Sequence, residues 1–296
     1  MGKHSGFFYG KKIAAFCLAV CLCLGILMES TVLTAEAEEA KPAYLIMVNR
    51  AANCVTVYEK DANGEVGVPV KAFVCSCGRE GHETPLGIFK TSDYYTWRRM
   101  VDGSYGQYAV RFNRGIMFHS VPYYTKNAGN MEWEQYNLLG EAASLGCVRL
   151  TCADAKWIYD NCAAGTEVIV YDDAGNPGPL GKPVEVKLAA ENPMRQWDPT
   201  DMNGMNPWNE LRPTLYLTGS VETNEVLMLP VGASWHDIYN AIGLMDATGN
   251  ICGLGEYIID ISGKYDLNRQ GIYNISVRGV SGLGVRTEKN MTLFVI

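Results

Sequence analysis

Short runs of apolar residues, separated by turns, dominate the chain up to residue 172. The runs are rich in Val, Ile, Tyr and Phe and too short for amphipathic helices, so they predict strands. We expect strands over residues 44–48, 54–58, 68–77, 115–120 and 166–171. This part of the chain is therefore predicted to be mainly β.

One stretch, residues 153–161, has helical spacing instead. Ala155, Ile158, Tyr159 and Cys162 recur at i, i+3, i+4 and i+7, which predicts a buried helix face that includes Cys162. Thr151 followed by Asp154 has the form of a capping box at the helix start. Gly165 is the expected stop.

The second half of the chain has two parts. Residues 173–213 are rich in proline and read as a linker, whose aromatic islands around Trp197 and Trp208 favour docking on the first domain over free flexibility. In residues 214–296, strand patterns separated by turns predict a β-sandwich. Those strands are expected over 226–229, 257–261, 271–277 and 291–296.

The first 37 residues have the features of a secretory signal peptide. Lys11 and Lys12 precede an apolar run over residues 13–28, and Ala35-Glu36-Ala37 has small residues at the positions expected for cleavage after Ala37. The alternative is an uncleaved anchor, although the run is shorter than the roughly 20 residues of a spanning helix. We expect a secreted, extracellular or wall-associated protein, membrane-anchored if the signal is retained.

Charge and composition exclude several classes of function. The chain has 25 basic and 32 acidic side chains, a net charge of −7, and no polybasic patch, which argues against binding to nucleic acid. No glycine-rich loop opens a helix after a strand, so no phosphate cofactor is expected. Cys75, Cys77 and His82 offer three ligands at an unusual spacing for zinc. We interpret the two cysteines as small apolar side chains and His82 as a solvated loop residue, and predict no metal.

The candidate chemistry lies in the segment Ser144-Leu145-Gly146-Cys147-Val148-Arg149-Leu150. If residues 147–150 are extended, Cys147 and Arg149 share one face. A cysteine thiol with a pKa of about 8.5 needs a base or a positive charge nearby to become a useful nucleophile. His119, which ends the strand over 115–120, is the best candidate base.

Together, His119-Ser120 and Ser-x-Gly-Cys-Val-Arg-Leu resemble the catalytic domain of the L,D-transpeptidases (YkuD type) of bacterial cell-wall synthesis. Thr84-Pro85-Leu86-Gly87-Ile88-Phe89 and Tyr105-Gly106-Gln107-Tyr108 add to the resemblance, which covers residues 42–172. It implies a β-sandwich with a short helix after the catalytic cysteine. Many members have histidine where this chain has Leu145. The segment over 214–296 resembles bacterial immunoglobulin-like modules.

The resemblance implies thioester chemistry on peptidoglycan stem peptides. Cys147 would attack a tetrapeptide stem and expel its terminal D-alanine, and an amine of a neighbouring stem would then form a 3,3 cross-link. Water in place of the amine would make the site an L,D-carboxypeptidase. His119 would act as general acid and base, oriented by the carbonyl or hydroxyl of Ser120. No cofactor is needed.

The remaining candidate site residues are Gly146, Arg149, Ser144 and Tyr108, and for the last three there are two interpretations each. The backbone amides of Gly146 and Cys147 are candidates for an oxyanion hole. Arg149 would bind a substrate carboxylate or form a structural ion pair. Ser144 would contact substrate or brace its turn, and Tyr108 would line the groove or pack in the core.

Other partners and functions follow from the same resemblance. A carbapenem-type β-lactam would acylate Cys147, and the C-terminal module would bind a wall or surface ligand. The absence of a histidine at Leu145 leaves a catalytically inactive wall-associated protein as an alternative. A papain-like protease is disfavoured, because there the cysteine precedes the histidine in the chain.

Overall fold

The computed structural model describes residues 43–218, 226–253 and 257–296, and the predicted signal peptide lies outside these ranges. A five-stranded sheet has the order β3-β2-β1-β9-β4. Its strands are β1 (Tyr44–Asn49), β2 (Cys54–Lys60), β3 (Val66–Val74), β4 (Gly87–Lys90) and β9 (Glu167–Tyr171). β1 and β9 are parallel, and the other pairs are antiparallel. The predicted strand over 68–77 ends at Val74, because Ser76 pairs instead with Arg149.

A second sheet carries the candidate site, and its order is β5-β6-β7-β8. The strands are β5 (Tyr94–Arg99), β6 (Tyr105–Asn113), β7 (Ile116–Ser120) and β8 (Val148–Leu150). β7 and β8 are parallel, with His119 opposite Arg149. The predicted strand at 115–120 is present, whereas the β5–β6 hairpin was not predicted.

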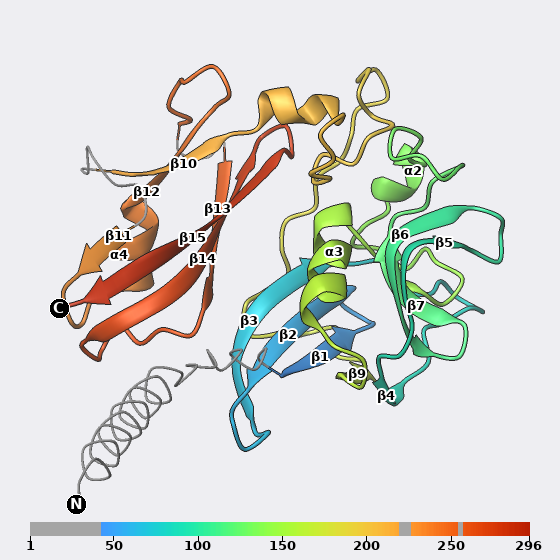
Figure 1. Ribbon diagram of the computed structural model, residues 1–296, viewed down its shortest axis with the longest axis horizontal. Coiled ribbons are helices and arrows are strands. Elements are labelled where there is room, and N and C mark those ends of the chain that lie inside the picture. The colour runs from blue at the N-terminus through green and yellow to red at the C-terminus, as the bar shows by residue number, and fades with distance from the viewer. Residues whose placement is uncertain (1–42, 219–225, 254–256) are drawn as a thin grey trace, which may run out of the picture. The chain divides into compact units, whose positions relative to one another are not determined.

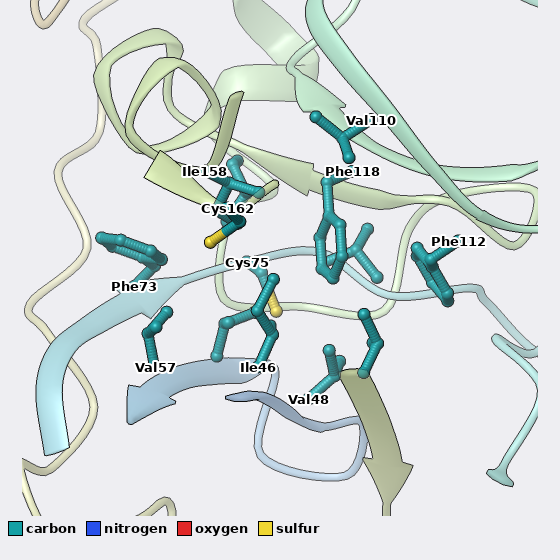
Figure 2. Close-up of a cluster of buried hydrophobic side chains, with 14 of the residues drawn as sticks. Ile46, Val48, Val57, Phe73, Cys75, Val110, Phe112, Phe118, Ile158 and Cys162 are labelled. Atoms are coloured by element: carbon teal, nitrogen blue, oxygen red, sulfur yellow. The ribbon is translucent and has the colours of Figure 1, made fainter. Parts of the chain in front are cut away.

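Helix α3 (Cys152–Asn161) directly follows β8. Figure 2 shows Ile158 and Cys162 from this part of the chain beside Phe118 of β7 and Phe73 of β3, in one buried cluster. Cys162 is 1% exposed, which confirms its predicted burial. The helix ends before Gly165, and Cys162 is its C-cap.

Three side chains satisfy the first backbone N–H groups of α3. Thr151 Oγ1 accepts from the amide of Asp154 at 3.2 Å, as the capping pattern predicts. Asp198 Oδ2 accepts from Cys152 at 2.7 Å, and Thr200 Oγ1 accepts from Ala153 at 3.0 Å. Two of the three caps therefore come from the predicted linker.

The segment over 173–213 packs on the catalytic part of the chain. It contains the short helix η1 (Pro207–Leu211). Another buried cluster is formed by residues that precede this segment, lie in it or follow it. Its members are Val121, Tyr123, Met131, Tyr136, Leu139, Leu188, Trp208 and Val285. Tyr136 belongs to the short helix α2 (Trp133–Tyr136). The docking expected from the aromatic islands is confirmed by the burial of Trp208, which is 1% exposed.

The C-terminal module has a four-stranded sheet of order β11-β15-β14-β13 and a two-stranded sheet of β10 and β12. Its elements are β10 (Thr214–Leu217), β11 (Val226–Leu229), α4 (Trp235–Asn240), β12 (Ile242–Met245), β13 (Tyr257–Gly263), β14 (Gly271–Ser281) and β15 (Arg286–Val295). Figure 1 shows these elements grouped together, in orange to red. Residues from both sheets and α4 share one buried core. The four predicted strands are present, and α4 was not predicted. The immunoglobulin-like assignment stays a prediction.

Buried ion pairs join this module to the start of α3. Asp154 lies 2.6 Å from Arg286 and 3.8 Å from Arg278, and Arg278 lies 2.5 Å from Asp260. Asp154 is 3% exposed, so the stability of its charged form depends on these partners.

Among the described residues, no helix is long and apolar enough to cross a membrane.

Candidate active site

Cys147 and His119 face the same pocket. Cys147 immediately precedes β8, and the parallel pairing of β7 with β8 brings His119 beside Arg149. Because side chains alternate along a strand, Cys147 and Arg149 fall on one face. A pocket of about 250 Å³ is lined by both, together with His119, Ser144 and Leu145.

The ring of His119 is held in one tautomer. Nδ1 lies 2.6 Å from the carbonyl oxygen of Ser120, and a carbonyl only accepts, so Nδ1 carries the proton. The hydroxyl of Ser120 is engaged elsewhere, since it accepts from the amide of Gln107 at 2.8 Å and donates to the carbonyl of Val121. The Nε2 atom of His119 is left as the basic nitrogen of the ring.

Both members of this pair are neutral near pH 7. The pKa of His119 is lowered to about 4, chiefly by burial and also by the positive charge of Arg149. Burial raises the pKa of Cys147 above its ordinary value, against smaller lowering effects of a backbone hydrogen bond from Met117 and of Arg149. The resting pair is a thiol and a neutral imidazole, so thiolate formation requires proton transfer to His119.

Gly106 of β6 lets the histidine ring lie close to the backbone. A Cβ atom at this position would lie 2.7 Å from His119 Nδ1 and 2.6 Å from Met100 Cε. Both distances are shorter than real side chains allow. Gly106 therefore helps to position the base, a role that sequence reasoning did not assign to it.

The turn before Cys147 is braced by Ser144. Its hydroxyl donates to the carbonyl of Cys147 at 2.6 Å and accepts from the amide of Gly146 at 3.0 Å. Ser144 is 1% exposed and both of these hydrogen bonds lie within the turn, which supports the bracing interpretation. Gly146 has φ of +120°, where a side chain would be strained.

These contacts correct the expected oxyanion hole. The amide of Gly146 is committed to Ser144 and does not point freely into the pocket. The amide of Cys147 has no hydrogen-bond partner within the described ranges. Of the two expected donors, only Cys147 N–H is available for a developing oxyanion.

Residues of distant segments support the same turn. Thr84 Oγ1 donates to the carbonyl of Gly146 at 2.9 Å, and the carbonyl of Cys77 accepts from the amide of Ser144 at 3.0 Å. Cys75 and Cys77 are fully buried, with their sulfur atoms 3.8 Å apart. In the part of the chain that the structure describes, no three His, Cys, Asp or Glu residues are grouped to hold a metal.

Arg149 is a buried cation at the pocket without an ion-pair partner among the described residues. It is 7% exposed, and its Nη1 atom donates to Gln135 Oε1 at 2.5 Å, a neutral partner. Its Nε atom has no partner, and no carboxylate of the described residues lies within ion-pair distance. The structural ion pair is therefore absent, which leaves the carboxylate-binding reading. Sequence reasoning missed Gln135, and no motif marks it.

The tip of the β5–β6 hairpin forms another wall of the pocket. Arg98, Arg99, Asp102 and Ser104 line it, as does Arg111 farther along β6. Arg111 pairs with Asp93, whereas Arg98 lies over the ring of Tyr95 at 4.8 Å. Residues 98–102 and 104 of this hairpin thus contribute to the pocket.

Two candidates lie elsewhere. Tyr108 has φ of +49°, and its ring packs 5.6 Å from that of Tyr159 on α3, which fits the core-packing alternative. It is not among the residues that line the pocket with Cys147. Lys156 Nζ lies 5.3 Å from the centre of the Tyr108 ring. His82 is exposed on its loop and does not line the pocket with Cys147.

Comparison with known proteins agrees with the motif. Residues 43–170 match the family described as the L,D-transpeptidase catalytic domain, YkuD. YciB, a Bacillus subtilis (strain 168) protein whose name assigns it to the L,D-transpeptidases, is 46% identical over 55 residues, 19% of this chain and 27% of YciB. The predicted family is thus confirmed for this part of the chain.

Solved structures of proteins named L,D-transpeptidases are also similar to this chain. An L,D-transpeptidase from Mycobacterium smegmatis is 23% identical, with a TM-score of 0.35 over 44% of this chain and 59% of that chain. One from Mycobacterium tuberculosis H37Rv is 26% identical, with a TM-score of 0.34 over 44% and 58%. LdtMt1 in complex with imipenem is 25% identical, with a TM-score of 0.34 over 44% and 59%. The chain spans about a quarter of YciB and less than two thirds of these solved chains.

Proposed function

Since residues 43–170 form a YkuD-type L,D-transpeptidase catalytic domain, we propose that this protein is an exported enzyme that makes 3,3 cross-links in peptidoglycan. The observation that carries the proposal is the shared pocket of Cys147 and His119, with the histidine proton held on Nδ1. A nucleophile beside a base of fixed tautomer is the arrangement that acyl transfer through a covalent intermediate requires.

Acylation begins from the neutral pair. His119 Nε2 takes the thiol proton as the sulfur of Cys147 attacks the carbonyl carbon of the third residue of a tetrapeptide stem. The oxygen that gains negative charge is stabilised by the amide of Cys147. His119 then returns the proton to the departing amine of D-alanine, and a thioester on Cys147 remains.

Arg149 would hold a carboxylate of the donor stem. Its Nε is buried without a partner among the described residues, and its Nη1 has only neutral partners, Gln135 and the carbonyl of Ala143. A substrate carboxylate would complete its hydrogen bonding. This contact would fix the scissile bond relative to Cys147.

Deacylation restores the enzyme. The amine of an acceptor stem attacks the thioester, its proton passes through His119 to the sulfur, and the cross-link is released. The low pKa of His119 keeps it neutral and ready to accept this proton. A carbapenem would acylate the same sulfur by ring opening, and LdtMt1 is a related protein seen in complex with imipenem. The C-terminal module, which we assign to the immunoglobulin-like class, would contact the wall.

Mass spectrometry of purified protein incubated with tetrapeptide muropeptides tests the proposal. A cross-linked dimer that lacks one D-alanine is expected from the wild type and from Cys252→Ala, a matched change of a cysteine outside the pocket. Cys147→Ala should give none. Tripeptide alone would indicate a carboxypeptidase, and no product from folded protein would favour the inactive wall-associated alternative.

A further inference from the structure

Asp102 is the single carboxylate among the residues that line the pocket with Cys147 and His119. Four arginines share this lining: Arg98, Arg99, Arg111 and Arg149. The protein as a whole carries a net charge of −7, so the pocket reverses the sign of the surrounding charge. A cationic substrate group would be repelled by every charged wall of the pocket except Asp102.

Only one of the two carboxylate oxygens of Asp102 accepts hydrogen bonds from described residues. Oδ1 accepts from the amide of Ser104 at 3.1 Å and from its hydroxyl at 2.6 Å, and these bonds hold the hairpin turn. Oδ2 has no hydrogen bond or ion pair to any described residue. One oxygen therefore remains for a ligand.

The charge of Asp102 acts on the reacting groups. Burial raises the pKa of Asp102, but the hydrogen bonds from Ser104 and the charge of Arg149 bring it below its ordinary value. It is ionised at neutral pH. The same charge raises the pKa of both His119 and Cys147, so Asp102 lies close enough to influence the site where the thioester forms.

We propose that Asp102 binds the acceptor amine in its ammonium form and so directs the thioester toward aminolysis rather than hydrolysis. The inference rests on the proposed function. The guanidinium groups of Arg98 and Arg99 on the same hairpin form no ion pair with any described residue and would bind a carboxylate next to that amine. The acceptor would then be a primary amine on an amino-acid centre with a free carboxylate.

The step balances without any further reactant. The bound ammonium first loses one proton to water, and the neutral amine attacks the thioester carbon. The carbon–nitrogen bond forms as the carbon–sulfur bond breaks, and the second proton passes through His119 to the sulfur of Cys147. Without a bound amine, water attacks instead and leaves a carboxylic acid.

Asp102→Asn removes the charge without removing the hydrogen bonds of the turn, because the asparagine Oδ1 can still accept from Ser104. We expect the ratio of cross-linked dimer to hydrolysed tripeptide to fall roughly tenfold, the order expected for one lost charge-assisted contact. Release of D-alanine in the first turnover should change much less than this ratio, because Asp102 is only a minor influence on His119 and Cys147. Glu134→Gln, an exposed carboxylate outside the pocket, should leave both values unchanged.

Hydroxylamine supplies a second readout, since it is largely uncharged near neutral pH. It should deacylate the wild type and Asp102→Asn at equal rates. An unchanged product ratio in Asp102→Asn would overturn the inference, and so would a parallel fall in D-alanine release, which indicates a structural role. A wild type that never releases D-alanine would refute the proposed function and this inference with it.

Discussion

At the scale of single residues, the proton of Cys147 decides how the site starts. In a preformed thiolate–imidazolium pair, the histidine pKa is high and the cysteine pKa is low. Here both shifts have the opposite sign, because burial disfavours the charged form of each group. The site therefore starts from a neutral pair, and the thiol proton has to be transferred when the sulfur attacks.

The pH dependence of alkylation at Cys147 tests this resting state. Because burial raises the thiol pKa, reactivity with iodoacetamide should be low near pH 7 and should still be rising above about pH 8.5. Peptide mass spectrometry at Cys147 measures the rate separately from the other cysteines. A plateau between about pH 4 and 8 that disappears in His119→Ala would contradict the neutral pair.

Gly106→Ala tests the close approach of backbone and base. The added methyl group would displace the ring of His119, and a shift of about 1 Å at such a site costs on the order of 10²-fold in rate. We expect kcat to fall with KM little changed and the fold retained by circular dichroism. Gly204→Ala is the matched control, since a Cβ there meets no atom within 4 Å. Equal activity of the two variants would remove the positioning role.

Sequence reasoning found the residues that share one motif and missed those that reach the pocket from elsewhere. Cys147, Ser144 and Arg149 are neighbours in the chain, so their common turn could be anticipated. Gln135 and Asp102 contact or face them only through the pairing of other elements. The place of Tyr108 was left open between groove and core, since its left-handed backbone is uncommon for a large side chain and gives no sequence signal.

At the scale of elements, α3 is the support of the catalytic turn. Its start is held by Thr151, Asp198 and Thr200, and the next element toward the N-terminus is β8. Because the first N–H groups of a helix have no internal partner, each cap contributes directly to the order of this junction.

Thr151→Ala should lower the free energy of unfolding by about 1 kcal/mol, the usual cost of a lost N-cap. The hydroxyl also donates to Asp154 Oδ2 at 2.8 Å, so the buried carboxylate loses one hydrogen bond as well. Urea denaturation followed by circular dichroism measures the change. An unchanged midpoint would mean that the two caps from the 173–213 segment hold the helix start by themselves.

Elements with continuous apolar runs were predictable, and partly exposed ones were not. β1, β2, β7 and β9 each lie within one or two residues of the predicted ranges. β5 exposes both of its arginines, and α4 buries only Ile238, so neither shows the apolar period of a core element. Register and strand order depend on pairing across the sheets, which the local pattern does not encode.

At the scale of the whole molecule, the segments predicted as separate domains are joined by buried contacts and an ion pair. The buried cluster around Tyr123 and Trp208 needs Val285 from the C-terminal module. Lys71 of β3 forms an ion pair with Glu288 of β15. These contacts join segments so distant in sequence that no local signal announces them. The match to the catalytic family ends at residue 170, but the buried core of that region continues beyond it.

Arg286→Met tests the ion pairs at the start of α3. Removal of one partner from a buried pair typically costs 3–5 kcal/mol, and we expect about 3 kcal/mol because Arg278 remains 3.8 Å from Asp154. Urea denaturation measures the loss. Arg269→Met is the exposed control and should be close to neutral.

The double variant Asp154→Leu/Arg286→Met should recover part of this stability, because it leaves no unpaired buried carboxylate. A double variant as unstable as Arg286→Met would show that the loss comes from packing and not from charge.

Asp154 and Arg286 are separated by 132 residues in the chain. At a synthesis rate of 5–20 residues per second, Asp154 is made roughly 7 to 26 s before the partner that neutralises it. During that interval the helix after Cys147 lacks the nearest ion-pair partner of the carboxylate at its start. We therefore expect full compensation of this charge, at the start of the helix that follows the catalytic strand, only once most of the C-terminal module exists.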